Sequence, residues 1–466
     1  MLHQGNPCPA STVFESETHP CLHALLSYQS DPFKKPMAAT TSLLVNQGAI
    51  VAVLWMFLVV SRRWVWSLLT TTKERNNRER SVSEVKYDFG GGRSDPDTFP
   101  VEALKEATLR VFDEQNRELN NYPGNMGHYG MRVAMAKRES EREGVTVSPD
   151  HLILTNGSMQ GVTLTAEMLQ ENHGDTVLVE EFSYPGTLSA YRALKYEMVG
   201  IKLDEGGMRM DHLEDELKRL DKAGRLPRFI YPISTYQNPT GFVMPRERRL
   251  EMIALARQYD IPIVEDNCYA DVHYEGPVEP SIYALDDDPN HIYLCSLSKI
   301  LAPGLRLGYI LAKPPMLARI LARRADAGGN YLAAAVVAEF YKDGIWQHAE
   351  VANAALKVKR DLTLSGLEEQ LNDVCVWSKP VGGLFIWVRL PEDVDRKRLF
   401  KLAEERGFHY LLGSSFHYRG QDVPYVRLAF GHLSHDEITE GIPVLAQCIR
   451  EARTSNEPRA FEGLFS

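Results

Sequence analysis

From about Tyr87 onward, the sequence predicts an α/β fold with a mainly parallel central sheet, followed by a smaller α+β domain. Short apolar segments bounded by turn residues alternate with amphipathic segments, which is typical of a parallel sheet flanked by helices. After about Tyr331 the alternation gives way to a long helical segment and then to short strands with Gly-rich turns. We therefore expect a large domain over 121–330 and a small domain over 331–466, with 81–120 as an N-terminal arm that forms part of the small domain.

The segments that predict the sheet are short and rich in apolar residues. Between them, segment 245–260 predicts a helix with Pro245 in its first turn. The apolar face of this helix would carry Met252, Leu255, Ala256 and Tyr259. The predicted strands are 151–155, 176–180, 228–233, 261–265, 291–296 and 308–312.

Outside this sheet, the pattern predicts one long helix over 334–371 and strands within 380–391 and 424–432. Near the start of the globular part, 101–118 has a helical pattern, and the Gly-rich loop 124–130 follows it. Loops with this composition often carry function, so we expect this one to cover a site.

Composition and charge exclude several classes of protein. A chain of 466 residues with 44% hydrophobic and 24% charged residues is neither a disulfide-stapled miniature, a disordered chain nor a polytopic membrane protein. The net charge of -10 argues against binding to nucleic acid, because neutralising phosphates requires clustered Lys and Arg. The six cysteines show no CxxC pair and no zinc spacing with His, so we expect reduced thiols and no metal.

The N-terminal extension, residues 1–80, contains an apolar run at about 43–60. Arg62 and Arg63 follow this run, with Trp64 and Trp66 close behind, as at a membrane interface. A run of this length fits a membrane anchor, and the positive-inside rule would leave the catalytic part in the cytoplasm. Two other interpretations stay open, a targeting segment that starts at about Met37 and a leader included through a wrong start codon.

The sharpest chemical motif is SLSKILAPGLRLG, residues 296–308, directly after a predicted strand. Its single lysine, Lys299, has serines on its N-terminal side and Arg306 seven residues on, which suits a Schiff-base lysine beside a phosphate site. This segment resembles the lysine motif of fold-type I pyridoxal-phosphate enzymes, the class I/II aminotransferases. The resemblance extends over roughly residues 87–450 and implies pyridoxal 5'-phosphate as the cofactor.

The resemblance assigns residues to the cofactor ring. In VEDNCYADVHYEG, Asp266 matches the carboxylate that binds the pyridine nitrogen, and Tyr269 matches the tyrosine that donates to the ring's phenolic oxygen. Asn238 of YQNPTG would share that oxygen and contact the substrate, and Tyr184 of EEFSYPGTL would stack on the ring. Taken alone, Asp266 also suits a cap, Asn238 a turn and Tyr184 the core.

The phosphate would lie at the turn of LTNGSMQG, which holds Gly157, Ser158 and Met159. Backbone N–H groups at a helix N-terminus bind phosphate, although Ser158 also suits a plain N-cap. By the same resemblance, further phosphate contacts would come from Ser296, Ser298 and Arg306, and from Tyr122 of a neighbouring subunit. The resemblance therefore implies a homodimer with its sites at the interface.

The substrate's carboxylate would bind Arg427 of PYVRLAFGH, which offers two parallel donors, and the backbone of Gly92. Segment 87–100, YDFGGGRSDPDTFP, is similar to the substrate segment of the aminoadipate, kynurenine and aromatic aminotransferase subgroup. It departs from that pattern at Arg93 and Ser94, where an apolar residue and a proline are common. Arg93 would either bind a distal carboxylate or point into solvent.

These residues predict an aminotransferase that moves an amino group from an L-amino acid to a 2-oxo acid, with an aromatic or bulky donor favoured by the subgroup. Lys299 would form the Schiff base and move the α-proton, with Asp266 and Tyr269 as the other catalytic residues. Two alternatives stay open. One is a pyridoxal-phosphate lyase, and the other is the sensing domain of a transcriptional regulator, against which the apolar N-terminal segment argues.

Overall fold

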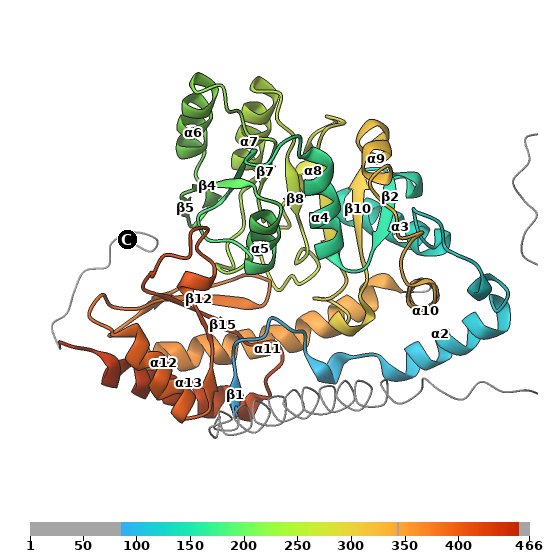
Figure 1. Ribbon diagram of the computed structural model, residues 1–466. Helices are drawn as coiled ribbons and strands as arrows, with labels where there is room; N and C mark the ends of the chain where they lie inside the picture. The colour runs from blue at the N-terminus through green and yellow to red at the C-terminus, as the bar shows by residue number, and fades with distance from the viewer. Residues whose placement is uncertain (1–84, 343, 456–466) are drawn as a thin grey trace, which may run out of the picture. The chain divides into compact units, whose positions relative to one another are not determined.

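The computed structural model describes residues 85–342 and 344–455 (Figure 1). The predicted anchor at about 43–60 lies outside the described residues, so it stays a prediction. Within the described part of the chain, none of the helices combines the length and the apolar character that a membrane crossing requires.

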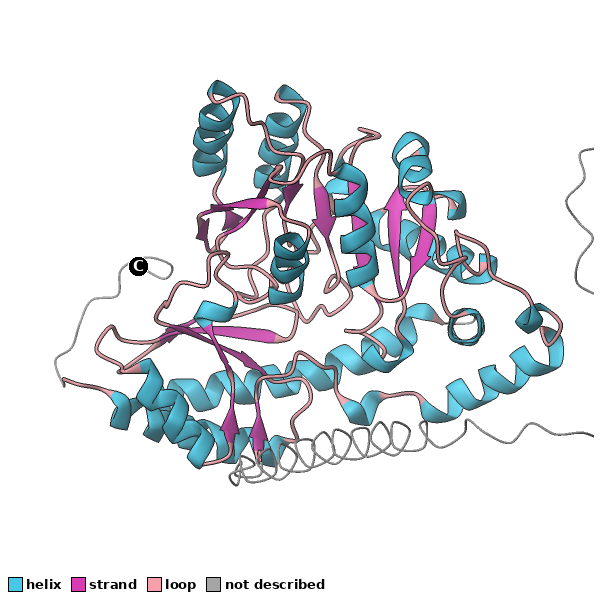
Figure 2. Cartoon of the chain, viewed as in Figure 1, coloured by secondary structure: helices cyan, strands magenta, loops and turns pink. Residues whose placement is uncertain are grey.

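A mainly parallel sheet forms the centre of the fold, as predicted (Figure 2). Strands β7 and β8 join its two halves, since Ile230 N donates to Pro262 O at 3.0 Å and Asp266 N donates to Pro232 O at 3.0 Å. Strand β10 runs antiparallel to both of its neighbours, and the other neighbouring pairs are parallel. In spatial order the strands are β4 (Glu197–Ile201), β3 (Thr176–Glu180), β7 (Ile230–Tyr231), β8 (Val264–Asp266), β9 (Ile292–Ser296), β10 (Gly308–Ala312) and β2 (Leu152–Thr155).

Two predicted strands are shorter in the structure than in the sequence pattern. The strand expected over 228–233 is reduced to β7, because Pro232 has no N–H to donate to a ladder. The strand expected over 261–265 begins only at Val264, after Pro262. The antiparallel hairpin β5 (Leu203–Asp204) and β6 (Gly207–Met208) lies outside the central sheet.

Helices flank the sheet (Figure 1). The helix predicted over 245–260 is α7 (Arg246–Gln258), and Pro245 is its N-cap and not part of its first turn. Its buried face also differs, because Arg249 and Ile253 are buried with Met252 and Ala256. The other helices before residue 330 are α2 (Val101–Glu114), α3 (Tyr129–Glu143), α4 (Ser158–Leu169), α5 (Pro185–Ala193), α6 (Met210–Lys222), α8 (Ile282–Leu285) and α9 (Pro314–Leu321).

The long helix predicted over 334–371 is two helices, α10 (Tyr331–Phe340) and α11 (Ile345–Leu371). Helix α10 ends with Tyr341 as its C-cap, and Gly344, with an extended φ of 177°, is the N-cap of α11. The helix predicted over 101–118 ends four residues early, at Glu114 of α2.

An antiparallel sheet forms the C-terminal part, in the order β11 (Val376–Trp377), β12 (Phe385–Arg389), β15 (Tyr425–Ala429) and β14 (Leu411–Leu412). Two helices pack with it, α12 (Arg396–Glu405) and α13 (His435–Ala452). The start of the described chain joins this part, because β1 (Tyr87–Asp88) pairs in parallel with β13 (Phe408–His409).

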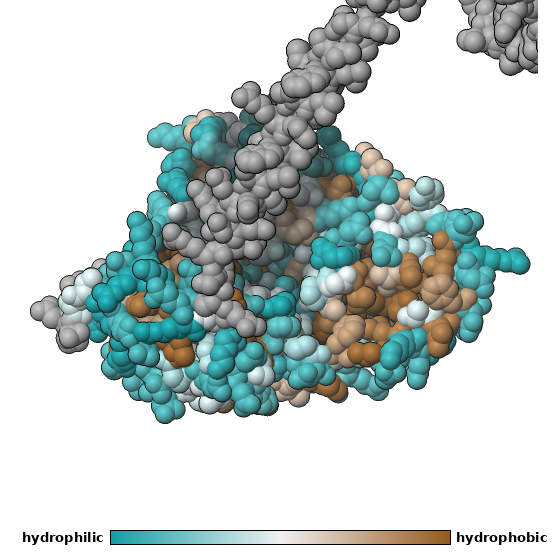
Figure 3. All heavy atoms as spheres, turned by 60° about the horizontal axis from the view of Figure 1, so that its bottom comes forward, coloured by the Kyte–Doolittle hydropathy of each residue, from teal (hydrophilic) through white to brown (hydrophobic). Residues whose placement is uncertain are grey.

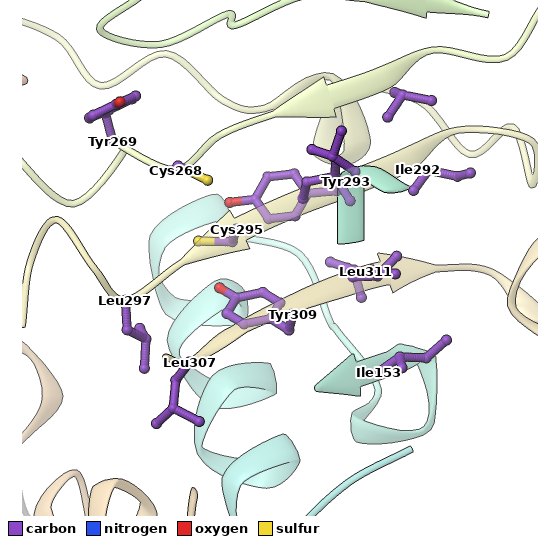
Figure 4. Close-up of a cluster of buried hydrophobic side chains, with 14 of the residues drawn as sticks. Ile153, Cys268, Tyr269, Ile292, Tyr293, Cys295, Leu297, Leu307, Tyr309 and Leu311 are labelled. Atoms are coloured by element: carbon purple, nitrogen blue, oxygen red, sulfur yellow. The ribbon is translucent and has the colours of Figure 1, made fainter. Parts of the chain in front are cut away.

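Hydrophobic side chains fill separate cores around these two sheets. In the larger core, Tyr293 and Cys295 of β9 lie beside Tyr309 of β10, and Ile153 of β2 lies beyond them (Figure 4). In the core of the C-terminal part, Phe89 stacks on Phe408 with their ring centroids 4.9 Å apart. The chain just before the Gly-rich segment 90–92 is thus fixed by packing.

Candidate active site

A cavity of about 230 Å³ lies where strands β8 and β9 end and helix α4 begins. Carboxyl ends of parallel strands are the usual place for ligand sites in α/β folds. Most of the residues predicted to hold the cofactor therefore meet in one place. The cavity is lined by Ser158, Met159, Tyr184, Ile233, Asp266, Cys268, Tyr269, Ser296, Ser298, Lys299, Pro303 and Arg306.

Lys299 follows strand β9 and extends its amine into this cavity. Its Nζ donates to the carbonyl oxygen of Gly92 at 2.7 Å and lies 5.8 Å from the centre of the Tyr269 ring. Burial lowers the pKa of Lys299 to about 8, and the charge of Arg427 acts in the same direction. A substantial fraction of the amine is therefore neutral near physiological pH, as a nucleophile or a base requires.

Asp266 is the last residue of strand β8 and is buried. Tyr231 OH donates to its Oδ2 at 2.5 Å, and the backbone N–H of Cys268 donates to its Oδ1 at 3.3 Å. Burial raises the pKa of Asp266, while these donors favour the charged form. The result is a hydrogen-bonded carboxylate on the wall of the cavity.

Tyr269, Asn238 and Arg427 form a hydrogen-bonded chain beside the cavity. Asn238 Nδ2 donates to Tyr269 OH at 3.0 Å, and Arg427 NH1 donates to Asn238 Oδ1 at 3.1 Å. Asn238 comes from the loop after β7 and Arg427 from the middle of β15, so the chain joins the two sheets.

Arg427 is a buried cation among aromatic rings. Its guanidinium carbon lies 4.3 Å from the centre of the Phe385 ring and 4.9 Å from that of Phe416. Burial lowers the pKa of Arg427 to about 10, and its Nε has no hydrogen-bond partner within the described chain. A buried guanidinium with a free donor is suited to a carboxylate ligand.

Where the cavity meets the start of helix α4, the backbone and the Arg306 side chain lie very close together. Gly157 has a φ of +77°, and a Cβ there would lie 2.5 Å from NH2 of Arg306. Arg306 NH2 donates to Asn156 O at 3.2 Å, and Ser296 Oγ accepts from Ser298 N at 3.1 Å. A helix N-terminus, hydroxyl groups and an arginine together make a binding site for an anion such as phosphate.

Residues 90–92, which we call the glycine strap, lie near the start of the described chain and pass over the site. Gly90 O accepts from Arg427 NH2, and Gly92 O accepts from Lys299 Nζ. A Cβ at Gly92 would lie 2.8 Å from the Phe385 ring, so a side chain there would push the strap away. The strap thus touches both the lysine and the arginine.

Arg93 forms an ion pair, and its side chain stays 42% exposed. Its NH2 pairs with Asp88 Oδ2 at 2.5 Å, and His409 Nδ1 lies 2.7 Å from Asp88 Oδ1. Ser94, the second departure from the subgroup's pattern, donates its hydroxyl to the carbonyl of Lys299.

Two parts of the chain that were expected at the site lie away from the cavity. Tyr122 is 88% exposed and does not line it. None of the loop 124–130 lines it either, because this loop packs on β2, where Leu154 N donates to Met126 O at 3.0 Å. Sequence reasoning missed Tyr231, whose position before Pro232 at a strand end marked the same sheet edge as Asp266.

Comparison with known proteins identifies the family. The sequence matches the family described as Aminotransferase class I and II over residues 87–445. This chain belongs to that family. Aromatic-amino-acid aminotransferase 1 of Thermococcus litoralis is 36% identical over 367 residues, which cover 78% of this chain and 88% of the relative.

Solved structures resemble this aminotransferase closely. A multiple substrate aminotransferase from Thermococcus profundus is 33% identical with a TM-score of 0.76, over 80% of this chain and 93% of the other. Kynurenine aminotransferase of Pyrococcus horikoshii, solved with PMP, is 32% identical with a TM-score of 0.75, over 81% of this chain and 94% of the other. The prediction of a fold-type I enzyme is therefore confirmed, and the protein is a pyridoxal-phosphate-dependent aminotransferase.

The residues of the cavity fit this cofactor. A buried carboxylate, Asp266, a lysine with a lowered pKa and the anion site at the start of helix α4 all line the same cavity. At the anion site, a Cβ on Gly308 would lie 2.8 Å from the backbone nitrogen of Ser158. Strand β10 and the start of helix α4 therefore lie so close together that a residue with a side chain does not fit at position 308. This donor set suits an aromatic ring with a basic nitrogen at one end and a phosphate at the other.

Proposed function

We propose that this aminotransferase moves the amino group of an L-amino acid with an aromatic or other bulky side chain to a 2-oxo acid, with Lys299 as the residue that binds the cofactor's aldehyde. The observation that carries the proposal is the amine of Lys299, which enters the same cavity as Asp266 and Tyr269 and has a pKa of about 8. When bound, pyridoxal phosphate supplies an electron-accepting ring conjugated to the substrate's nitrogen.

Lys299 is proposed to do two things. Its neutral amine would hold the cofactor through the aldehyde, and the freed amine would act on the proton of the substrate's α-carbon, first as a base and then as an acid. The hydrogen bond to Gly92 O holds Nζ beside the strap, which also contacts Arg427, the residue proposed to bind the substrate.

Asp266, Tyr269, Asn238 and Tyr184 are proposed to hold the ring. Asp266 would keep the ring nitrogen protonated, which its hydrogen bonds from Tyr231 and Cys268 support by stabilising the carboxylate. Tyr269 and Asn238 are hydrogen-bonded to each other and would share the ring's phenolic oxygen. Tyr184, on the cavity wall, would stack on the ring.

The phosphate is proposed to lie at the start of helix α4. The N–H groups of Ser158 and Met159, the hydroxyls of Ser158, Ser296 and Ser298 and the guanidinium of Arg306 would surround it, with Gly157 giving the turn its shape. The first N–H groups of a helix have no partner within the helix, so they are free to donate to the phosphate.

Arg427 is proposed to bind the substrate's α-carboxylate, together with Asn238 and the backbone of Gly92. Its buried guanidinium already has a fixed orientation between Gly90, Asn238 and two aromatic rings, and it lacks a carboxylate partner within the described chain. A carboxylate that enters there recovers the charge stabilisation that burial removes.

The proposed donor class rests on relatives. The relative from Thermococcus litoralis is named for aromatic amino acids, and the one from Pyrococcus horikoshii for kynurenine.

A panel of amino donors tests the proposal. Purified full-length enzyme would be given each L-amino acid with 2-oxoglutarate or with pyruvate, and the 2-oxo acid formed from the donor would be measured. We expect the highest kcat/KM with aromatic and large apolar donors. Higher kcat/KM with alanine or aspartate would refute the donor class, and ammonia released without an acceptor would favour a lyase.

We also propose a homodimer in which Tyr122 reaches the phosphate of the neighbouring subunit. Large apolar side chains are exposed on neighbouring helices, with Leu109 and Phe112 on α2, Val133 on α3 and Leu332 on α10, and Figure 3 shows hydrophobic residues gathered on one side of the molecule. An exposed patch of this kind is typical of an interface. Sedimentation equilibrium would give the mass of two chains, and a monomer at micromolar concentration would contradict the proposal.

The division into a large domain over 121–330 and a small domain over 331–466, with the arm 81–120, is retained as a proposal. It is supported by Tyr87 and Phe89, which pack in the same core as the C-terminal sheet. A small domain built from both ends of the globular part would place the strap and Arg427 in one body.

A further inference from the structure

The last residue of strand β3, Glu180, is a buried carboxyl group that the proposed mechanism does not use. Gln237 Nε2 donates to its Oε2 at 2.9 Å, and the backbone N–H of Ile233 donates to its Oε1 at 3.3 Å. Ser183 Oγ donates to Oε2 at 3.4 Å. One carboxyl group thus contacts residues from two loops, the loop after β3 and the loop after β7.

Both loops carry residues of the site. Ser183 precedes Tyr184, which lines the cavity, and Gln237 precedes Asn238, which contacts Tyr269 and Arg427. Gln237 adds a second link between the loops, because its Nε2 also donates to the carbonyl of Phe182 at 2.7 Å. The side chain of Glu180 therefore fixes the distance between the two loops that hold the ring.

Glu180 has no cation to balance a negative charge. None of the lysines, arginines and histidines in the described part of the chain forms an ion pair with it, whereas the nearby buried Glu265 lies 3.6 Å from Arg249. An ionised carboxylate buried without a cation is strongly destabilising. Burial raises the pKa of Glu180 to about 8, and the negative charge of Asp266 adds to the effect.

We propose that Glu180 is a positioning residue, which as a neutral carboxylic acid holds the Tyr184 and Asn238 loops against the cofactor ring and leaves Asp266 as the anion beneath that ring. The proposal rests on the cofactor-binding roles proposed above for Tyr184, Asn238 and Asp266. It adds a residue outside the cavity and assigns that residue a protonation state.

The surroundings of Glu180 support this state. Asp266, at the end of β8, is the charged group that acts on it, and the groups that contact it from the two loops are a serine hydroxyl, an amide side chain and a backbone N–H. Tyr231, on the strand between them, directs its hydroxyl to Asp266. The two negative charges would disfavour each other at these buried positions, and the Ser183 hydroxyl, 3.4 Å from Glu180 Oε2, can accept a hydrogen bond from a proton on that oxygen.

Three variants of the full-length enzyme test the proposal. Glu180→Gln keeps the size of the neutral acid and one accepting oxygen, and Glu180→Ala removes the whole carboxyl group. Glu181→Gln is the matched control, because Glu181 is the adjacent carboxyl group, is partly exposed and lies 3.8 Å from His417, outside the cavity. The first measurement is the Kd of the apoenzyme for pyridoxal phosphate at pH 7, from fluorescence quenching.

We expect Glu181→Gln to bind within about twofold of the wild type, Glu180→Gln to bind about threefold more weakly, and Glu180→Ala to bind about tenfold or more weakly, because the glutamine leaves one buried donor unpaired and the alanine leaves all of them unpaired. Equal weakening in Glu180→Gln and Glu180→Ala would overturn the neutral-acid state. Wild-type affinity in a folded Glu180→Ala would overturn the positioning role.

The second measurement is Tm against pH for the wild type and Glu180→Gln, both as apoenzymes, and it does not depend on the alanine variant folding. Between the unfolded pKa near 4.5 and the folded pKa of about 8, the folded wild type holds a proton that the unfolded chain releases, so its stability falls as pH rises. Glutamine has no such proton.

We therefore expect the Tm of Glu180→Gln minus the Tm of the wild type to rise from pH 5 to pH 8. Above pH 8 this difference should level off. A difference that does not change with pH would overturn the proposal. A wild type that binds no pyridoxal phosphate would instead refute the proposed function, and the Tm difference would still report the protonation state of Glu180.

Discussion

Two groups of buried charged residues in this protein differ in how their charges are compensated. The buried ion-pair network consists of Arg138, Glu139, Arg142 and Glu143 of helix α3 and Asp271 of the loop after β8. There Arg142 meets Asp271 at 2.8 Å and Glu143 at 3.0 Å. In the active site, by contrast, Lys299 and Arg427 are bound to carbonyl and amide oxygens and have no carboxylate partner within the described chain.

The pKa values follow this difference. Burial opposes the charge of Arg142, but Glu139 and the other neighbouring acids outweigh it and raise the pKa. At the site, burial acts without that compensation and lowers the pKa of Lys299 to about 8 and of Arg427 to about 10. In the network each arginine meets at least two acids, so its charge is compensated within the protein, whereas cations left without carboxylates are available to the groups of a ligand.

Among the active-site cations, Lys299→Ala should give the largest effect on activity. We expect kcat/KM to fall by more than about a thousandfold, because the variant loses both the attachment of the cofactor and the proton transfer. Its Tm as apoenzyme should not fall, since a buried amine without a carboxylate partner adds little stability. Borohydride should bleach and label the wild type but not the variant.

Lys222→Ala is the matched control for this experiment, because Lys222 ends helix α6 on the surface. It should keep wild-type activity. If Lys299→Ala retained activity within about tenfold of the wild type, the assignment of the lysine would be wrong.

Arg142→Met should give the next largest effect, and it should act on stability. Removing one member of a buried ion-pair network leaves acids without their cation and costs about 3 to 5 kcal/mol. We expect this loss in urea unfolding at pH 7, with the Kd for pyridoxal phosphate changed by less than about threefold. A large loss of cofactor affinity at unchanged stability would place Arg142 in the site.

Lys137→Met controls for the loss of a positive charge on the same helix. Lys137 is exposed and lies 3.7 Å from Glu141. Surface pairs of this kind contribute little, so a change below about 0.5 kcal/mol is expected.

The smallest effect should come from pH alone. The rate at which the apoenzyme takes up pyridoxal phosphate covalently should rise about tenfold per pH unit below pH 8 and level off above it, because only the neutral amine attacks an aldehyde and burial sets the pKa of Lys299 to about 8. Stopped-flow absorbance would follow the reaction. A rate that still rose tenfold per unit above pH 9 would indicate an ordinary exposed lysine, with a pKa near 10.4.

The sequence pattern predicted the central sheet well where apolar runs are uninterrupted, as in Leu152–Thr155, Ile292–Ser296 and Gly308–Ala312. It could not reveal that the last of these runs antiparallel to its neighbours. Strands buried on both faces have the same apolar pattern in either direction. The break between α10 and α11 was also missed, because the helical pattern continues through the turn before Gly344.

In the site, the family's motifs led to nine of the twelve residues that line the cavity, and they did not mark Ile233, Cys268 or Pro303 as part of it. They could not predict which carbonyl Lys299 meets or that Arg427 contacts Asn238, since these contacts join segments far apart in the chain. Glu180 and Arg142 were overlooked for a different reason. Charged residues are usually exposed, and nothing in a single sequence marks the few that are buried.

The glycine strap has a consequence for how the enzyme is assembled during synthesis. The residues around Phe89 are held by strands made much later, since Phe89 N donates to His409 O at 2.8 Å and Ala429 N donates to Phe89 O at 2.8 Å. A ribosome that has just released Lys299 has not yet made either strand. All residues that line the cavity are thus made before the strands that hold the strap, and the proposed carboxylate site is complete only when the chain beyond residue 429 emerges.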